Sequence, residues 1–386
     1  MKKRMYIVNK MIFIVHIMLF TILKLRFVQK QKNTLLLVRL DKIGDYILFR
    51  NFIEVIAKSD KYKGYDIFLC GNISWKELSE KLDSKYINKF IWINRIQFRN
   101  SFYYKWEKMK EVNSLGCEMA IESTYSREYL YGDSIIAASN ATKRIGTSGE
   151  LIPKIMLKRK IVYNKLFTNI IQANPRNKFE FFRNKEFFEQ ILNEPITLTK
   201  TSLITDSFSS TYNFQEKYVL MAPGAGEEKR IWSPENFSKL INFITDQKSL
   251  NIILVGSHSE LKITRIILTK IKNKKKVIDV TGKTSLIDLV LLIKNASLVI
   301  THDTGTLHIS GAFNKKTVCL SNGMHYNRFV PYPKNLFSEG IFIFPNAITE
   351  EYAEQYRFNS DFEIDRITFS QVIQVFDKLI NQLDIK

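Results

Sequence analysis

Cysteine and histidine are scarce in this sequence. The three cysteines, Cys70, Cys117 and Cys319, are odd in number and widely spaced, which argues against a disulfide framework and a cysteine-based zinc site. We expect them to be small core residues that stay reduced. The five histidines form no HExxH motif and have no cysteine-rich neighbourhood. The sequence therefore predicts no structural metal site.

Acidic residues are few relative to basic ones. The 386 residues include 58 Lys and Arg against 38 Asp and Glu, which gives a net charge of +20. A charged fraction of 25% and an aromatic fraction of 13% exclude a disordered chain, and the length suits two domains. A basic protein of this size usually meets an anionic partner, such as nucleic acid, a membrane surface or a phosphorylated ligand. Composition alone does not choose among these three.

Residues 1–32 contain eight basic residues and no acidic one. This leader holds an apolar run, Met11–Leu23, that reaches about 20 Å as a helix, less than the roughly 30 Å of a bilayer core. No small-residue cleavage site follows it, as a signal peptide would require. We predict a basic, apolar helix that lies on an anionic membrane surface. Two alternatives stay open: a helix docked on the folded body, and a single membrane span.

Short apolar runs alternate with amphipathic segments along most of the chain. This pattern predicts parallel strands that are covered by helices on both faces. It occurs twice, on either side of a polar stretch over 150–215, so we predict two Rossmann-like α/β domains whose parallel sheets face each other across a cleft. The predicted domains are 33–205 and 206–386, after the leader. The predicted strands are 35–40, 66–70, 90–94, 118–122, 218–224, 251–256, 276–282, 298–301 and 317–320.

The first motif that carries chemistry is RLDKIGDYILFRNFIEVI, residues 39–56. Here a strand ends, a loop with Gly44 turns, and Asp45 stands at the entrance of a helix. A carboxylate at this edge of a sheet can accept a proton from a hydroxyl nucleophile. The alternative is that Asp45 only caps its helix. Asp41 is a competing carboxylate, which we expect to pair with Lys42 or Arg39 or to face solvent.

The second motif is MAPGAGEEKRIWSPENFSKLI, residues 221–241. Its small residues, including Ala225 and Gly226, let a ligand approach the backbone amides closely. Lys229 and Arg230 follow at once, and clustered cations beside such a turn suit a diphosphate. The motif is not a Walker A loop. The alternative is a solvated charged turn with Trp232 in the core.

The third motif is LVITHDTGTLHISGAF, residues 298–313. A buried strand is predicted to lead into a helix, whose free N-terminal amides form an anion site without a metal. Asp303 as a plain helix cap and His308 as a core histidine are the alternatives. The residues of interest are Asp303, Thr304, Gly305, Thr306 and His308.

Three weaker candidates come from shorter segments. Glu260 follows a predicted strand, where a carboxylate can accept hydrogen bonds from a ribose diol. Arg127 and Arg144 are predicted near the cleft edge of the first domain, where they would suit an anionic acceptor. For each of the three, a plain surface role is the alternative.

Taken together, RLDKIGD, PGAG…KRIWSPENF, VGS…E and DTGTLHISGA resemble glycosyltransferase family 9, the ADP-heptose:lipopolysaccharide heptosyltransferases. The resemblance covers most of residues 34–335 and implies a GT-B fold, no metal requirement and inversion at the sugar carbon. Where the family usually has K-R-W-P, this chain has the longer K-R-I-W-S-P. Which cation reaches the phosphates, Lys229 or Arg230, therefore stays open.

The resemblance also implies a role for each motif. It implies that Asp45 is the catalytic base, and that Arg230 or Lys229 contacts the donor phosphates. The implied donor-binding residues are Ala225, Gly226, Glu260, Asp303, Thr304, Gly305, Thr306 and His308.

The function that the resemblance implies is inverting transfer of a sugar without a metal or other cofactor. The implied donor is ADP-heptose or another nucleotide-sugar. The implied acceptor is a lipopolysaccharide-type or other cell-surface glycan, either lipid-linked or a core oligosaccharide. With the leader, this predicts a cytoplasmic protein that is peripheral on the inner face of the bacterial membrane. The alternatives are a GT-B transferase or epimerase for another nucleotide-sugar, and a basic nucleic-acid-binding protein without catalysis. The second alternative requires a Lys/Arg stripe with aromatics, which the scattered basic residues do not indicate.

Overall fold

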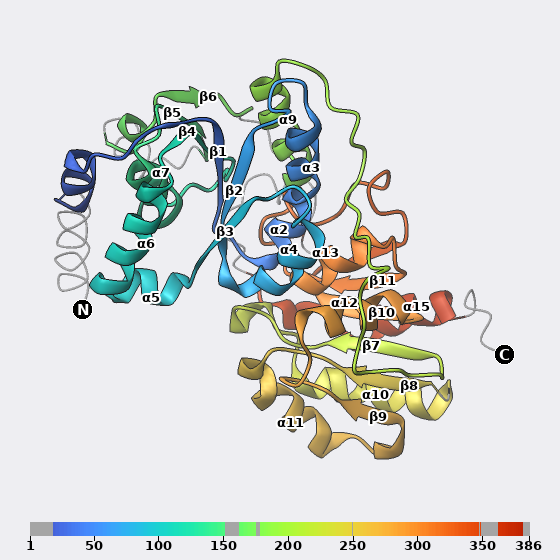
Figure 1. Cartoon of the computed structure of the whole chain (residues 1–386). Coiled ribbons are helices and arrows are strands. Elements are labelled where there is room, and N and C mark those ends of the chain that lie inside the picture. The colour runs from blue at the N-terminus through green and yellow to red at the C-terminus, as the bar shows by residue number, and fades with distance from the viewer. Residues whose placement is uncertain are drawn as a thin grey trace. The chain divides into compact units, whose positions relative to one another are not determined.

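The computed structural model of the chain describes residues 18–150, 162–174, 178–248, 250–346, 348 and 362–380. Within these ranges the chain forms two compact units (Figure 1). Unit 1 contains the residues up to Arg176 together with Phe182–Leu198, and unit 2 contains Asn177–Phe181 and the residues from Thr199 onward.

Unit 1 is built on a six-stranded parallel sheet with the strand order β3-β2-β1-β4-β5-β6. Strand β1 lies between β2 and β4, in the middle of the sheet. Its apolar residues Leu35–Val38 are buried on both faces, as a central parallel strand requires. The strands are β1 Gln31–Arg39, β2 Asp66–Asn72, β3 Lys89–Ile93, β4 Cys117–Glu122, β5 Lys143–Thr147 and β6 Asn169–Ile171. The helices are α2 Ile43–Phe49, α3 Asn51–Lys58, α4 Lys76–Leu82, α5 Arg95–Asn100, α6 Phe102–Ser114, α7 Ser134–Ser139 and, mostly in unit 1, α9 Glu180–Leu192.

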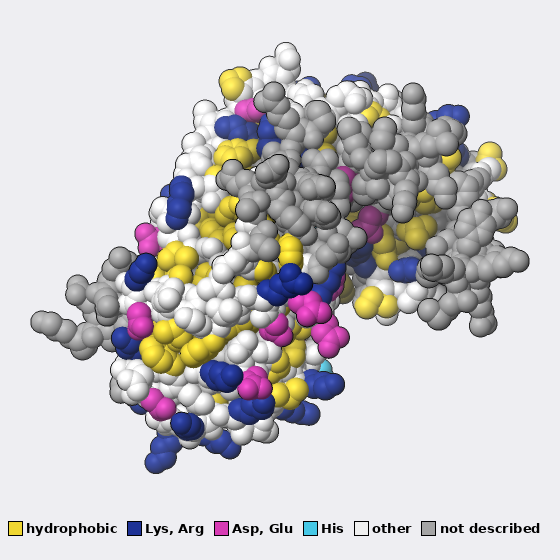
Figure 2. All heavy atoms as spheres, turned by 180° about the vertical axis from the view of Figure 1, so that it is seen from behind, with side chains coloured by type: hydrophobic (Ala, Val, Ile, Leu, Met, Phe, Trp, Pro, Cys, Tyr) yellow, Lys and Arg dark blue, Asp and Glu magenta, His cyan; other side chains and the backbone are white. Residues whose placement is uncertain are grey.

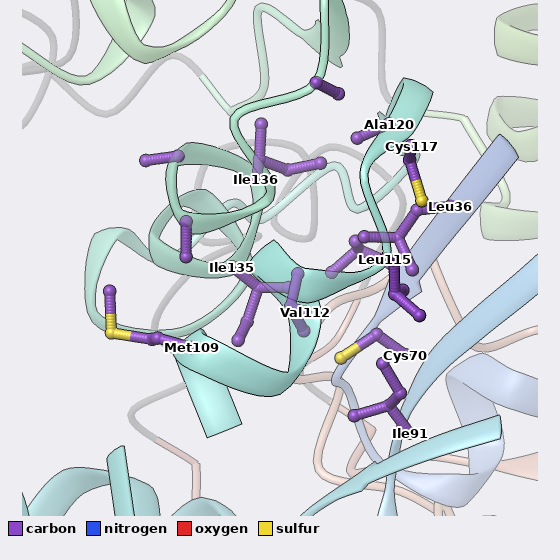
Figure 3. Packing of buried hydrophobic residues seen from close by; sticks show 14 of the residues in the cluster. Leu36, Cys70, Ile91, Met109, Val112, Leu115, Cys117, Ala120, Ile135 and Ile136 are labelled. Atoms are coloured by element: carbon purple, nitrogen blue, oxygen red, sulfur yellow. The ribbon is translucent and has the colours of Figure 1, made fainter. Parts of the chain in front are cut away.

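A hydrophobic core joins this sheet to the helices on one of its faces (Figure 3). Leu36, Cys70 and Ile91 come from neighbouring strands, and they face Val112 of α6 and Ile135 of α7. All three cysteines of the chain are buried and unpaired, as predicted for small core residues.

Unit 2 repeats the same topology. Its sheet has the order β12-β11-β10-β7-β8-β9, which is the order of the first sheet when the strands are counted from β7. This is the Rossmann strand order, so the predicted fold class, α/β with two Rossmann-like parallel sheets, is confirmed. The strands are β7 Tyr218–Ala222, β8 Asn251–Leu254, β9 Val277–Asp279, β10 Leu298–His302, β11 Thr317–Leu320 and β12 Gly340–Ile343. The helices are α10 Pro234–Gln247, α11 Leu261–Lys270, α12 Leu286–Asn295, α13 Gly305–Ala312 and α15 Phe369–Ile380.

The start of α10 is explained by local residues. Ser233 is the N-cap of α10, where its hydroxyl accepts a hydrogen bond from the Asn236 amide at 3.3 Å, and Pro234 is the first helical residue. The sequence did not predict the short strands β5, β6 and β12. A three-residue strand such as β6 has too few apolar residues to give a periodic pattern, and its partner β5 alone makes it a strand.

Most of the predicted leader, residues 1–17, lies outside the described residues. Residues 18–25 form a helix that packs on unit 1 through Leu19, Phe20 and Leu23. Its other side leaves Met18 and Ile22 exposed. Among the residues that the structure describes, none of the helices combines the length and the apolar character needed to cross a bilayer.

The buried side of this helix can be tested by substitution. Leu23 is 1% exposed, so Leu23→Asp places a carboxylate in the core and should lower the free energy of unfolding by about 2–4 kcal/mol. The matched control is Ile22→Asp on the exposed side, which should change it by less than about 0.5 kcal/mol. Denaturant unfolding of both variants measures the difference, and equal effects would show that the helix is not docked through Leu23.

Candidate functional site

The end of β1 and the start of α2 carry the first candidate, Asp45. It lies in the first turn of α2 and is half-buried, while the N-cap position is taken by Lys42, whose side chain makes no capping hydrogen bond. Asp45 therefore lies within the first turn and not at the N-cap position. Its carboxylate is close to the N-terminal, positive end of the helix dipole.

The competing carboxylate, Asp41, has internal partners. Arg39 Nε lies 3.0 Å from Asp41 Oδ2, and the Thr124 hydroxyl donates to Asp41 Oδ1 at 3.2 Å. The predicted pairing of Asp41 with Arg39 is confirmed. Asp41 therefore connects the end of β1 with the segment that follows β4.

Helix α2, which carries Asp45, is fixed by a buried polar cluster. The Tyr46 hydroxyl donates to Asp83 Oδ2 at 2.6 Å, and Arg50 donates to Asp83 Oδ1 at 2.9 Å. The Tyr46 ring also stacks on Trp75, with 4.4 Å between the ring centroids. The buried ion pair and these additional hydrogen bonds fix α2 to the segment around Asp83. The backbone next to Asp45 is therefore held in a defined place.

In unit 2, the turn after β7 is shaped around Glu260. A Cβ at Gly224 would lie 1.9 Å from Glu260 Oε1, so only glycine leaves room for this carboxylate. Glu260 Oε2 accepts hydrogen bonds from the amide and the hydroxyl of Ser257, the latter at 2.8 Å, which forms a capping box. Beyond Gly224, Ala225 is half-buried and Gly226 is exposed.

Arg230 joins the second and third motifs. Its guanidinium donates to Asp303 Oδ2 at 3.0 Å and also to the Asp303 carbonyl oxygen. Asp303 is thus the partner of Arg230, while Thr304 occupies the N-cap position of α13. Burial raises the pKa of Asp303.

The two candidate cations differ in their surroundings. The Arg230 side chain is 18% exposed and points to the start of α13 through Asp303. The Lys229 side chain is 39% exposed, and its Nζ lies 3.7 Å from Glu227 in the same turn. Arg230 is therefore the better-positioned group for an anion bound at the N-terminus of α13.

His302 connects three segments of this site, a role that the sequence did not reveal. Its Nε2 accepts a hydrogen bond from the Trp232 amide at 3.0 Å, so its Nδ1 carries the proton and donates to the Gly224 carbonyl at 3.2 Å. Burial lowers the pKa of His302 to about 4, because the charged ring would be desolvated. The neutral histidine thus ties the turn after β7 and the segment after Arg230 to the end of β10.

This arrangement predicts a loss of stability in acid. The pKa of His302 falls from an ordinary 6.5 to about 4 on folding, so its contribution is complete above pH 6.5 and is lost as pH falls toward 4. The loss amounts to about 3 kcal/mol of the free energy of unfolding. Denaturant unfolding of His302→Gln should show a flatter pH dependence over this range, whereas His258→Gln, at an exposed position, should keep the slope of the parent chain. An unchanged slope in His302→Gln would contradict a neutral, buried His302.

The third motif opens α13 with small residues. The Thr304 and Thr301 hydroxyls lie 3.3 Å apart, and Gly305 and Thr306 form the first turn of the helix. Free amides at such a turn, beside Arg230, can bind an anion.

His308 lies behind that turn, in the interior of unit 2. Its Nδ1 is 2.6 Å from the Tyr332 hydroxyl, and its Nε2 is 3.9 Å from Asp303 Oδ1. Burial lowers the pKa of His308 to about 3, so the ring is neutral at physiological pH. His308 supports Asp303 from within the fold.

The two arginines predicted for the acceptor side have internal partners. Arg127 makes two 2.9 Å hydrogen bonds to Asp133 and donates to the Thr147 carbonyl at 2.7 Å. Arg144 donates to the carbonyls of Leu166 and Ala141. These bonds fix both guanidinium groups within unit 1, and their acceptor role stays a prediction.

Unit 1 has a small hollow at the carboxyl ends of β4, β5 and β6. The Arg183 guanidinium lies 3.7 Å from the centre of the Tyr125 ring and forms one wall. Arg183, Glu186 and Gln190 line the hollow from one face of α9 because they are three to four residues apart. Ligands of such sheets bind at this edge.

Within the described part of the chain, no group of three or more His, Cys, Asp or Glu side chains is arranged to hold a metal ion. In unit 2, the charge of Arg230 and the amides at the start of α13 suit an anion.

Comparisons with known proteins agree with this geometry. A model of glycosyltransferase family 9 (heptosyltransferase) matches residues 135–348. Among curated proteins, none matches the sequence.

Several solved structures are similar to the chain over nearly its whole length. The glycosyl transferase family 9 protein from Veillonella parvula has a TM-score of 0.68 at 17% identity, and the match covers 92% of this chain and 100% of that protein's chain. The E. coli ADP-heptose lps heptosyltransferase II has a TM-score of 0.65 at 14% identity, covering 90% and 99%. The E. coli heptosyltransferase WaaC with ADP-2-deoxy-2-fluoro heptose has a TM-score of 0.64 at 14% identity, covering 90% and 99%. At these identities the similarity concerns the fold, which is of the GT-B type.

Proposed function

The chain belongs to glycosyltransferase family 9, and we propose that it transfers heptose from ADP-heptose to a lipopolysaccharide-type or other cell-surface glycan, with inversion and without a metal. As a member of this family it is a glycosyltransferase of the heptosyltransferase type. The observation that carries the proposal is the contact between Arg230 and Asp303, which brings two motifs 73 residues apart together at the start of α13.

The proposed donor site is in unit 2. The diphosphate would bind the first amides of α13, at Thr304, Gly305 and Thr306, and the guanidinium of Arg230. Ala225 and Gly226 would lie on the phosphate side, and Glu260 would accept hydrogen bonds from the ribose hydroxyls. Two solved neighbours are described with ADP-heptose or a fluorinated ADP-heptose in their names, which supports an ADP-sugar as the donor.

The proposed base is Asp45. The acceptor hydroxyl attacks the anomeric carbon while Asp45 takes its proton, a new C–O bond forms, and the bond from that carbon to the β-phosphate oxygen breaks. ADP leaves with the electron pair, and its growing charge is stabilised by Arg230, Lys229 and the α13 amides. The mechanism also requires water to be excluded from the reacting atoms.

A sugar of the acceptor would bind against the mouth of the small hollow in unit 1. Its walls offer a cation at Arg183, a carboxylate at Glu186, an amide at Gln190 and the face of Tyr125. This mixture of hydrogen-bond donors, acceptors and an aromatic surface suits a sugar ring. A lipid-linked acceptor would be reached at an anionic membrane surface, so we place the protein on the inner face of the cytoplasmic membrane, held by its basic leader.

Two other functions, those of an epimerase and of a nucleic-acid-binding protein, would give different observations. An epimerase would isomerise the donor without any acceptor, which product analysis detects. A nucleic-acid-binding protein requires a continuous basic stripe, but on the face shown in Figure 2 the described Lys and Arg side chains are interspersed with acidic and uncharged ones.

The proposed donor is tested by a thermal-shift screen of nucleotide-sugars. A ligand that binds only the folded state raises the melting temperature by mass action, so ADP-sugars should stabilise the chain more than UDP- or GDP-sugars. The screen should give the same result with EDTA present, because no metal is proposed. ADP-sugars that stabilise no better than the others would contradict the heptose assignment.

A further inference from the structure

We propose that unit 1 has a membrane-docking surface with two contact points: the side of residues 18–27 that faces away from the core, and the corner between α5 and α6. The proposal rests on the membrane-surface location in the proposed function. It adds a second contact outside the leader, and it makes the leader helix part of a folded surface. The occupant is an anionic lipid bilayer.

The first contact point is the outer side of the helix over residues 18–25. Met18, Ile22 and Leu25 lie on one face because they are four and three residues apart, and they are 47–83% exposed. Phe27, just after the helix, is 97% exposed. A helix that packs on a core normally presents polar residues to water. This helix is apolar on both sides, as expected for one that lies between a core and a membrane.

The second contact point is the α5–α6 corner, formed by Ile96, Phe102 and Tyr103. These side chains are 60–75% exposed, although Phe98 between them is fully buried in the core. The corner is well supported: Asn94 and Ser101 cap the two helices through their side chains. A rigid corner that presents two aromatic rings and an isoleucine suits insertion at the interface of a bilayer.

The exposed apolar side chains concentrate in these two places. Among the described residues eleven large hydrophobic side chains are exposed, and seven of them lie within 18–27 and 96–103. Isolated exposed hydrophobics need no explanation, but a concentration of this kind does. Helix 18–25, α6 and α5 follow one another along the same edge of unit 1 (Figure 1), and their buried residues share one core cluster.

The charge around the first contact point identifies the partner. Residues 18–32 contain four basic residues and no acidic one. At the α5–α6 corner the exposed cation is Arg99, because Arg95 pairs with Glu128 and Lys105 is buried. Apolar side chains next to basic ones complement anionic lipids. Because Leu19, Phe20 and Leu23 anchor the leader helix in the core, this contact would orient unit 1 on the bilayer.

The test is co-sedimentation of the full chain with vesicles of phosphatidylethanolamine and phosphatidylglycerol, against vesicles of phosphatidylcholine. The parent chain should bind the anionic vesicles more strongly, and less so in high salt. The pair Ile22→Asp and Leu25→Asp should weaken binding by about tenfold or more, and so should the pair Phe102→Asp and Tyr103→Asp. The matched control is Ile204→Asp with Ile278→Asp, at exposed positions in unit 2, and it should bind like the parent.

Three results would overturn the proposal. Unchanged binding of the Phe102/Tyr103 pair would remove the second contact, and equal binding to phosphatidylcholine would remove the role of charge. A dimer of the parent chain in solution that either pair of substitutions dissociates would show that a second copy covers this surface. Stabilisation of every variant by the same nucleotide-sugar shows that folding and the donor site are intact, so failure of vesicle binding is separable from failure of the proposed function.

Discussion

Replacing Asp45 by asparagine should lower the turnover of sugar transfer by about 10²–10⁴-fold, because the acceptor hydroxyl loses the group that takes its proton. Asparagine keeps the size and polarity of the side chain in the first turn of α2. Donor binding should be retained, since the proposed donor residues all belong to unit 2. Acceptor-dependent release of the nucleoside diphosphate measures turnover, and the thermal shift caused by the nucleotide-sugar measures donor binding.

Asp41→Asn is the matched control for Asp45→Asn. Asp41 is engaged by Arg39 and Thr124, so its substitution should lower stability while changing turnover by less than about tenfold. Parent-like turnover in Asp45→Asn would show that Asp45 is not the base. A large loss in Asp41→Asn alone would assign that role to Asp41.

Replacing Arg230 by alanine should lower kcat/KM by about 10²–10³-fold, because a positioned charge at the departing diphosphate is removed. The nucleotide-sugar should also stabilise this variant less than it stabilises the parent chain. Asp303 loses its partner in this variant and is buried, so the melting temperature should fall even without ligand. Steady-state kinetics and thermal unfolding with and without donor separate these effects.

Lys229→Ala is the comparison that decides between the two cations. Its side chain is more exposed than that of Arg230 and its salt bridge is to Glu227, so we expect a loss of less than about tenfold in kcat/KM. If Lys229→Ala loses more activity than Arg230→Ala, Lys229 is the residue that contacts the diphosphate.

Most of the fold was predictable because its signals are local. Continuous apolar runs such as Leu35–Val38 identify central parallel strands, and Ser233-Pro234 marks the start of α10 at the residue where it begins. The strands β5, β6 and β12 were missed because they are short and depend on a neighbouring strand for their hydrogen bonds. The order of strands in each sheet was not predicted from the pattern.

The candidate site was predictable as a set of residues but not as a set of contacts. Asp303 and Arg230 were both named from their motifs, yet their pairing was not foreseen. His302 was passed over because nothing in its neighbours along the chain indicates that it bonds Trp232 and Gly224. The sequence predicts Arg127 near the cleft edge of the first domain, with a plain surface role as the alternative, and only its bond to Asp133 explains why it is buried.

The sequence by itself determined the class of the fold, the glycine-containing turns and the residues from which a phosphate site can be built, because each depends on residues close together in the chain. Only the tertiary structure decided which of these residues meet. Arg230 reaches Asp303, and Glu260 fills the space left by Gly224, because parallel strands bring their carboxyl ends to one edge of a sheet. The leader divides in the same way. The sequence alone showed that it has basic residues and no acidic one, and only the packing of Leu23 showed which side of its helix is exposed.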